Sequence, residues 1–505
     1  MAKLVSVNPA NGKELSSVKI ATKAEVEVVV KKARVGFKEW KNVPLAKRAG
    51  IVLKLAGLLS KKKEILGKLI SQEMGKPLVE AVDEVSVGVE LVKYQAETAL
   101  KELRDEVIDT KVTATMLKQM DKLNDQDRLS FMIRKNIKVC SVIRFDPVGV
   151  VAAIKPWNFP VDSILLSVIP ALLAGNSVVL KPSEYTPLVT EELAKLIWQA
   201  GVPKNVLQVL HGRSQVGAML VDSEIDMVSF TGSTEVGKEI AEKCASRLIK
   251  CSLEMGGSSP AIILRDADLD LAVNGVLWGR FNNCGQVCNS IKRVIVENKV
   301  ADEFVKKLTK AVEDLKVGDP MDKKTDVGPL VSLKQLRKLQ DQVTKGVVQG
   351  GRIVVGGRRM RDEKSMQGFY HEMTLMVFVR QAMDIMQEET FGPILPVMQV
   401  ENFKEAIKVA NGTKFGLTAA VYTKSKLLAK QAMNELQAGS VYVNDSSVIP
   451  LEAPWCGVKE SGLGVGGGRF GLMEYVQQKH MHINLTKDKN RDYWFPYDKK
   501  GSADK

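Results

Sequence analysis

The sequence has few of the residues that bind metals. It contains four histidines and six cysteines in 505 residues, and the cysteines are scattered apart from Cys284 and Cys288. No group of them has the spacing of zinc ligands, and their number and spread do not match a disulfide framework. The sequence therefore predicts neither a metal site nor a fold held by disulfides.

Long apolar runs are also missing. The longest, residues 164–180, is interrupted by Pro170, Gly175 and Asn176 and is too short to span a bilayer. The N-terminal segment lacks the apolar core of a signal peptide. We therefore expect a cytoplasmic protein with no membrane partner.

Aromatic residues make up only 6% of the chain, while 73 basic and 59 acidic residues give a net charge of +14. A charge of this size could attract nucleic acid. The basic residues are spread along the chain, however, and no arginine-rich tract alternates with aromatic residues. We interpret the charge as a lysine-rich solvated surface and expect no nucleic-acid partner.

The hydrophobic pattern of the first half is that of an α/β protein. Apolar spacing predicts helices over 24–40 and 45–74, and residues 129–144 predict two strands or one long hairpin. Strands and helices then alternate. The expected strands cover 148–154, 177–182, 206–210 and 227–230, and the expected helices cover 162–174, 190–199 and 235–247. Gly175 should end the first of these helices in a left-handed cap. This alternation predicts a parallel sheet covered on both faces, of the dinucleotide-binding type, although a GxGxxG motif is absent.

The second half repeats the pattern less clearly, and a glycine-rich loop at 461–471 follows it. The expected strands cover 294–297, 353–357, 393–400, 419–423 and 439–445, and the expected helices cover 302–315 and 403–411.

Two segments carry candidate functional groups in turns. FTGSTEVG (230–237) lies between a strand and a helix, so Gly232 and Ser233 would lie at a helix N-terminus that can bind a pyrophosphate. A glycine turn with a serine cap explains this segment equally well. FNNCGQVCNS (281–290) places Cys288 in a glycine-containing turn, where a thiol of lowered pKa is a candidate nucleophile. Two buried apolar cysteines are the alternative.

Two further segments place polar side chains beside rigid turns. PWNFP (156–160) sets Asn158 between two prolines, where its amide could donate to a developing oxyanion. CSLEMGGSSP (251–260) sets Glu254 beside two glycines. A turn asparagine and a solvated glutamate are the alternatives.

In this order and spacing, the motifs resemble the aldehyde dehydrogenase superfamily over about residues 5–485. The match also includes KPSE (181–184), F-x-N-x-G-Q-x-C ending at Cys288, EETFGP (388–393) and P-x-x-G-x-K-x-S-G (454–462). The resemblance implies a Rossmann-like cofactor domain (1–127 and 147–256) and an α/β catalytic domain (257–443). It also implies a β element (128–146 and 470–490) that bridges subunits of a homodimer or homotetramer.

The resemblance also implies a mechanism. Cys288 matches the nucleophile that forms a thiohemiacetal and then a thioester, and Glu254 matches the base that activates the hydrolytic water. Asn158 matches the amide that holds the oxyanion together with the backbone N–H of Cys288. The implied reaction is the NAD(P)-dependent oxidation of an aldehyde to its carboxylic acid.

The same resemblance assigns residues to the cofactor. Glu184 would accept the hydroxyls of the adenosine ribose and so favours NAD, while Lys181 beside it leaves NADP use open. Glu389 would bind the nicotinamide ribose, and Phe391 would pack beside the nicotinamide. The remaining implied cofactor residues are Trp157, Ser183, Gly232, Ser233 and Met255.

Several alternatives stay open at this point. Relatives that pass the thioester to coenzyme A generally lack the glutamate, so Glu254 favours hydrolysis. A non-catalytic binding protein is disfavoured because Cys288, Glu254 and Asn158 are all present. Oxidation could join Cys284 to Cys288 as an off-switch, or Cys284 is an incidental small apolar residue. A semialdehyde, a phosphorylated aldehyde and a simple aliphatic aldehyde all remain candidate substrates.

Overall fold

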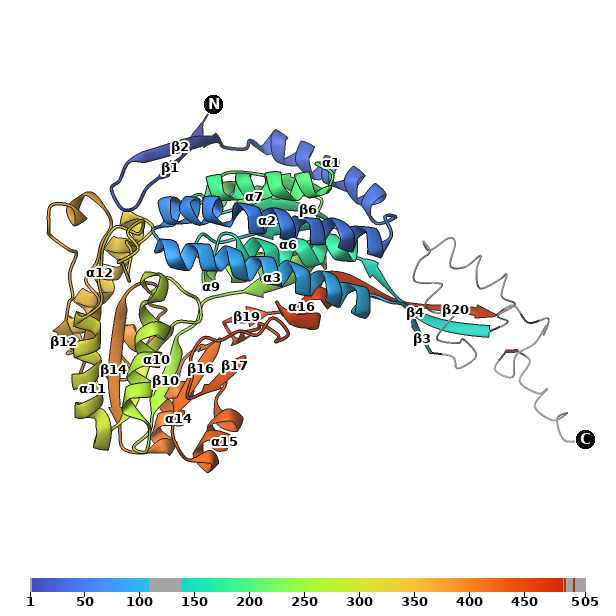
Figure 1. The fold of residues 1–505 in the computed structure, drawn as a ribbon. Coiled ribbons are helices and arrows are strands. Elements are labelled where there is room, and N and C mark those ends of the chain that lie inside the picture. Colours follow the sequence, from blue (N-terminus) through green and yellow to red (C-terminus); the bar gives the residue numbers. More distant parts are fainter. Residues whose placement is uncertain (1, 109–138, 485, 487–493, 496–505) are drawn as a thin grey trace, which may run out of the picture.

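The computed structural model describes residues 2–108, 139–484, 486 and 494–495. Its chain forms two large sheets with helices packed on them and a narrow third sheet that projects from the body (Figure 1). Of the helices in the described ranges, none combines the length and apolar character that a membrane span requires.

The N-terminal region is largely helical, as the sequence predicts. It forms α1 (Lys23–Trp40), α2 (Leu45–Met74) and α3 (Leu78–Glu102). The prediction missed an antiparallel hairpin before these helices, β1 (Lys3–Val7) and β2 (Glu14–Lys19). The pattern of β2 explains the miss, because its residues alternate only between exposed and half-buried. Such a strand lacks the apolar face that periodicity detects.

The first large sheet confirms the predicted parallel arrangement. Its order is β19-β9-β8-β5-β6-β7, and only the short β19 runs antiparallel to its neighbour. The strands are β5 (Val150–Ile154), β6 (Ser177–Lys181), β7 (Leu207–Val209), β8 (Met227–Thr231), β9 (Lys250–Glu254) and β19 (Gly462–Leu463). The connecting helices are α6 (Asp162–Ala174), α7 (Pro187–Ala200), α8 (Ser214–Val221) and α9 (Thr234–Arg247). Gly175 ends α6 with φ 99°, as predicted.

Both faces of this sheet are covered. One apolar core joins it to α2, α3, α6 and α7, and a second core joins the opposite face to α1, α8 and α9. Burial on both faces explains why its strands are continuous apolar runs rather than alternating ones.

The second large sheet has the order β12-β13-β14-β11-β10-β16-β17, and only β12 is antiparallel to its neighbour. Its strands are β10 (Ser259–Ile263), β11 (Ile291–Glu297), β12 (Arg352–Val355), β13 (Thr374–Val377), β14 (Ile394–Val400), β16 (Thr418–Tyr422) and β17 (Ser440–Val443). Helices α10 (Leu269–Phe281), α11 (Asn298–Glu313) and α12 (Leu333–Val348) cover one face, and α14 (Phe403–Asn411) and α15 (Lys426–Glu435) cover the other.

One prediction for this sheet needs correction, and several of its elements, β10, β13, α10 and α12 among them, were not predicted. The strand expected at 353–357 ends at Val355, because the N–H of Gly357 donates to the side-chain hydroxyl of Thr374 at 2.9 Å instead of to a backbone carbonyl of β13. Helix α12 carries an apolar stripe that the sequence analysis did not assign.

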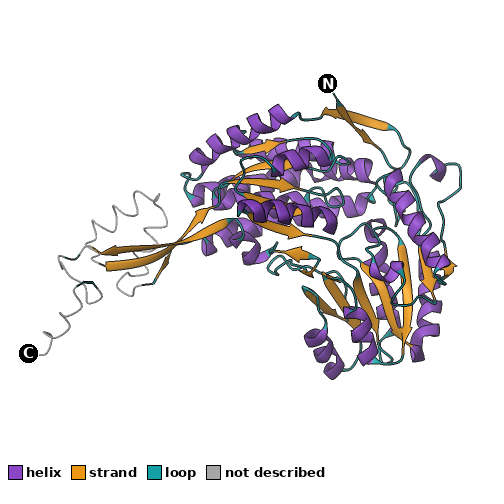
Figure 2. Cartoon of the chain, turned by 180° about the vertical axis from the view of Figure 1, so that it is seen from behind, coloured by secondary structure: helices purple, strands orange, loops and turns teal. Residues whose placement is uncertain are grey.

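The projecting sheet, drawn in orange at the left of Figure 2, consists of β3 (Glu106–Val107), β4 (Val139–Pro147) and β20 (Val476–Asn484), in the order β20-β4-β3. The described part of the expected local hairpin at 129–144 is β4, which pairs with β20 from the far end of the chain. Residues 129–138 lie outside the described ranges. The β element expected at 470–490 begins with a short helix, α16 (Gly468–Met473), and its strand starts at Val476.

Candidate active site

The loop before Cys288 has an unusual backbone. It is a 3₁₀ turn, η1 (Asn282–Gly285), in which Asn283 and Cys284 have φ values of 48° and 58°. Such left-handed angles are uncommon for residues other than glycine and persist only where the surroundings hold them. Gly285 continues the left-handed path with φ 68°, and a side chain there would lie 2.6 Å from the Gly392 carbonyl oxygen. The loop therefore needs strong anchors.

Those anchors come from side chains on both sides of the loop. The Asn283 backbone N–H donates to Glu80 on α3 at 2.8 Å, and its side chain donates to the Asn158 carbonyl at 3.0 Å. The buried side chain of Gln286 donates to the Asn283 carbonyl and accepts from the Val331 N–H at 2.9 Å. These bonds fix the path of the chain into Cys288.

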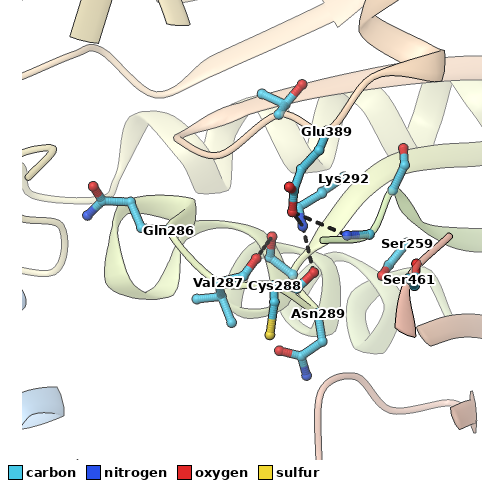
Figure 3. Close-up of polar contacts among 12 residues, drawn as sticks. Ser259, Gln286, Val287, Cys288, Asn289, Lys292, Glu389 and Ser461 are labelled. Carbon is cyan, nitrogen blue, oxygen red and sulfur yellow. Dashed lines mark hydrogen bonds and ion pairs between the residues drawn. The ribbon is translucent and has the colours of Figure 1, made fainter. Parts of the chain in front are cut away.

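Cys288 lies half-buried between this loop and β11 (Figure 3). Burial raises the pKa of its thiol to about 11, while the nearby Lys292 lowers it. The Lys292 ammonium donates to the Cys288 carbonyl at 2.6 Å and to Glu389 at 2.7 Å. The thiol is thus only partly exposed, and the Lys292 ammonium acts on it.

Asn158 reaches the same loop from the other large sheet. It follows β5, is 6% exposed, and donates through its amide to the Gln286 carbonyl at 3.0 Å. Because Gln286 precedes Cys288 by two residues, the amide lies against the segment that carries the nucleophile. An amide nitrogen has a second N–H to give.

Glu254 ends β9 and is 8% exposed. Both of its carboxylate oxygens are buried, and neither makes a close hydrogen bond among the described residues, although the Gly466 N–H lies near enough to lower the pKa. Burial raises the pKa of this carboxyl to about 8, and Lys155 opposes the shift. A buried carboxyl with a pKa near neutrality suits a general base.

Lys155 lies near Glu254 because of strand register. Lys155 follows Ile154, which pairs with Phe230 on β8. Thr231, the residue after Phe230, pairs with Glu254 on β9. The Lys155 ammonium donates to Ser229 at 3.0 Å and to Thr231 at 3.3 Å. Burial lowers the pKa of Lys155, and Glu254 raises it.

The expected dinucleotide residues lie at the carboxyl edge of the first sheet. Lys181 is the last residue of β6, and Ser183 and Glu184 follow it. Gly232 and Ser233 follow β8, with β5 between the two strands. Ser233 caps α9 by accepting from the Val236 N–H at 3.5 Å. A side chain at position 232 would lie 2.4 Å from the Phe230 ring, so this turn requires glycine.

The remaining cofactor candidates connect the two large sheets. The Trp157 ring packs edge-on to Phe391, with centroids 5.6 Å apart. Glu389 accepts from the Gly257 N–H at 3.2 Å. Met255 packs against the first turn of α9, where a side chain on Gly237 would lie 2.2 Å from its sulfur. Trp157, Glu389 and Phe391 thus lie at the seam where the carboxyl ends of β5 and β9 meet the amino ends of β10 and β14.

Comparison with known proteins places this geometry in a family. The model of the aldehyde dehydrogenase family matches residues 2–481. The mitochondrial succinate-semialdehyde dehydrogenase of Arabidopsis thaliana is 36% identical over 486 residues, covering 96% of this chain and 86% of that protein. The chain belongs to the aldehyde dehydrogenase family. It is therefore an enzyme that oxidises aldehydes to carboxylic acids, as the motifs predicted.

Other members of the family differ in their named substrates and cofactors. The NADP-dependent succinate-semialdehyde dehydrogenase of Escherichia coli is 34% identical, with 95% of this chain and 94% of that protein covered. A solved structure of betaine aldehyde dehydrogenase from Staphylococcus aureus in complex with NAD⁺ has a TM-score of 0.89 and 32% identity. The similarity covers 98% of this chain and 94% of the betaine aldehyde dehydrogenase chain. The similarity confirms the predicted aldehyde dehydrogenase fold.

The structure adds site residues that sequence reasoning gave no role. Asn283 and Gln286 stand in the quoted F-x-N-x-G-Q-x-C motif, so their signal was present. Lys155 and Lys292 gave no signal, because their contacts depend on which strands lie side by side. Cys284 is 1% exposed within the core of the second sheet, which agrees with the apolar interpretation of that cysteine.

Proposed function

We propose that this aldehyde dehydrogenase works through covalent catalysis by Cys288 and hydrolysis by Glu254, with NAD as the preferred cofactor. The observation that carries the proposal is the seam between the two large sheets. There the half-buried Cys288 thiol, the Asn158 amide and the buried Glu254 carboxylate come from three separate segments.

In the proposed first step, the Cys288 thiolate bonds to the aldehyde carbon, and the carbonyl electron pair moves to oxygen. The second N–H of Asn158 and the backbone N–H of Cys288 donate to that oxygen. A nicotinamide bound beside this carbon would supply the hydride acceptor that lets the C=O bond re-form. A thioester on Cys288 remains.

In the second step, Glu254 removes a proton from water as the water oxygen bonds to the thioester carbon. The C–S bond then breaks and returns the Cys288 thiolate, and the carboxylic acid leaves. The burial of Glu254 favours this role, because desolvation raises its pKa toward neutral pH.

The cofactor would lie across the carboxyl edge of the first sheet, as in open parallel sheets generally. Gly232 and Ser233 would hold the pyrophosphate at the N-terminus of α9, and Glu184 the adenosine ribose. Glu389 and Phe391 would bind the nicotinamide half beside Trp157, while Lys181, Ser183 and Met255 would also contact the cofactor. The close approach at Gly232 and the serine cap fit this use.

Substituting the oxyanion donor tests the first step. We expect Asn158→Asp to lower kcat by about 10²–10³-fold, because the carboxylate replaces a donor with an acceptor. Steady-state kinetics with the best aldehyde would measure the loss. Asn282→Asp, on the exposed side of the nucleophile loop, is the control, and an equal loss there would contradict the role of Asn158.

Cofactor preference follows from charge at position 184. Wild type should favour NAD, because the Glu184 carboxylate repels a 2′-phosphate. Glu184→Ser should shift the ratio of kcat/KM for NADP over NAD upward by about tenfold. Glu192→Gln, an exposed acid on α7, should leave the ratio unchanged. If the ratio of kcat/KM for NADP over NAD stays constant in Glu184→Ser, the Glu184 carboxylate does not determine cofactor preference.

We also propose that the regions 1–127 and 147–256 bind the dinucleotide and that 257–443 forms the catalytic domain. The regions 128–146 and 470–490 would join subunits into a homodimer or homotetramer. The projecting sheet supports this, because most of β20 is exposed and so small a sheet is marginally stable alone. The cytoplasm is the proposed compartment, since Cys244, Cys251, Cys284, Cys288 and Cys456 are free thiols.

A further inference from the structure

A buried lysine in the candidate active site, Lys292, has no role assigned by the sequence motifs. Lys292 is the second residue of β11, and its side chain is 1% exposed. Its ammonium donates to the Cys288 carbonyl at 2.6 Å and to Glu389 Oε1 at 2.7 Å (Figure 3). One charged group thus contacts both the nucleophile's backbone and the carboxylate proposed for the nicotinamide ribose.

The contacts of Glu389 are one-sided. Gly257 donates its N–H to the same oxygen, Oε1, at 3.2 Å. Oε2 packs against Gly256, where a side chain would lie 2.1 Å away. Among the described residues, every hydrogen bond to this carboxylate reaches Oε1. The protein therefore fixes one oxygen and leaves the other available as an acceptor.

Lys292 and Glu389 depend on each other because their charges are opposite. An ammonium removed from water needs a carboxylate partner, and Glu389 is the carboxylate that Lys292 contacts. The Phe391 ring centroid lies 5.6 Å from the same ammonium. Lys292 also lowers the pKa of Cys288, while Glu389 and Glu254 raise it. The orientation of Glu389 and the ionisation of the thiol thus depend on one side chain.

We propose that Lys292 is a positioning residue that holds Glu389 ready for the hydroxyls of the nicotinamide ribose and ties it to the carbonyl of Cys288. This rests on the proposed function, in which Glu389 binds the cofactor and Cys288 is the nucleophile. Lys292 acts through these two residues and does not touch the substrate.

The first test measures cofactor binding without turnover. NAD is titrated calorimetrically into the full-length protein, with no aldehyde present. Lys292→Met and Glu389→Gln should each weaken binding by about tenfold, and the double variant should be no weaker than either single one. Lys307→Met is the matched control, because Lys307 pairs with Asp270 at the same 2.7 Å but on the surface. It should bind NAD as wild type does.

The second test measures the thiol in the cofactor-free protein. The rate of Cys288 alkylation by iodoacetamide is followed against pH, with the modified peptide identified by mass spectrometry. Lys292→Met should move the profile to higher pH, and Glu389→Gln should move it to lower pH. General loosening of the structure would not shift the two profiles in opposite directions.

The outcomes separate this inference from the proposed function. If Glu389→Gln binds NAD as tightly as wild type, the cofactor role of Glu389 fails and the inference fails with it. If Glu389→Gln binds NAD more weakly but Lys292→Met matches wild type in both tests, only the inference fails. The same holds if the losses of NAD affinity in the two single variants add in the double variant. Should Lys292→Met not fold, Lys292→Arg and Lys292→Gln replace it, with binding retained in the first and weakened in the second.

Discussion

Cys288→Ala should abolish aldehyde oxidation, with a fall in kcat of at least about 10⁴-fold. Without the thiolate there is no thiohemiacetal, and the aldehyde carbon holds no alkoxide that could expel hydride. The measurement is the absorbance of reduced nicotinamide across a panel of aldehydes, each with NAD and with NADP. The panel would include succinic semialdehyde, glyceraldehyde, its 3-phosphate, and short aliphatic and aromatic aldehydes. The aldehyde with the highest kcat/KM in wild type would name the substrate class.

The control for this prediction lies in the same loop. Cys284→Ala removes a thiol that is buried in the second core rather than facing the seam, so it should keep activity within about threefold while losing some stability. Iodoacetamide should inactivate wild type with one label on Cys288. Turnover that survives in Cys288→Ala would falsify covalent catalysis by this residue.

Local patterns in the sequence predicted much of the fold. The helix predicted at 45–74 is α2 (Leu45–Met74) and the one at 403–411 is α14 (Phe403–Asn411). Both have apolar stripes that pack on a sheet or on helices, and that burial is what periodicity reports. The prediction failed where pairing is long-range, because nothing near β4 in the sequence reveals that its partner is β20.

The same limit applies to the site. Cys288, Glu254 and Asn158 stand in short motifs whose glycines and prolines are visible in the sequence. Lys155 directly follows β5 and Lys292 lies in β11, and in the sequence both look like ordinary polar residues. Their contacts arise only when β5 lies beside β8, and when β11 carries Lys292 to the loop of Glu389. Spatial neighbours of this kind cannot be found from a single sequence.

Glu254→Gln should separate the two halves of the reaction. The glutamine keeps the shape of the side chain but cannot take a proton from water, so the thioester should persist on Cys288. We expect steady-state turnover to fall by about 10²–10⁴-fold. A rapid burst of reduced nicotinamide, equal to one per active site, should remain. Rapid-mixing absorbance measures the burst, and mass spectrometry of the quenched enzyme detects the acylated Cys288.

Coenzyme A gives this experiment a second use. If the enzyme were CoA-acylating, adding coenzyme A would restore turnover in Glu254→Gln, because the thiol of coenzyme A would replace water as the acceptor of the acyl group. We expect no restoration. A variant that loses the burst as well as the turnover would show that Glu254 acts before the thioester forms, which contradicts its proposed role.

The pH dependence of hydrolysis follows from the environment of Glu254. Burial raises its pKa to about 8, and a base works only when deprotonated. Where hydrolysis limits turnover, kcat should therefore fall by about tenfold for each pH unit below 8. Lys155 favours the carboxylate form, so Lys155→Met should raise the pKa of Glu254 and move the profile to higher pH. Lys238→Met, which removes an exposed partner of Glu460, should leave the profile in place. A Lys155→Met profile equal to that of wild type would mean that the buried ammonium does not act on the base.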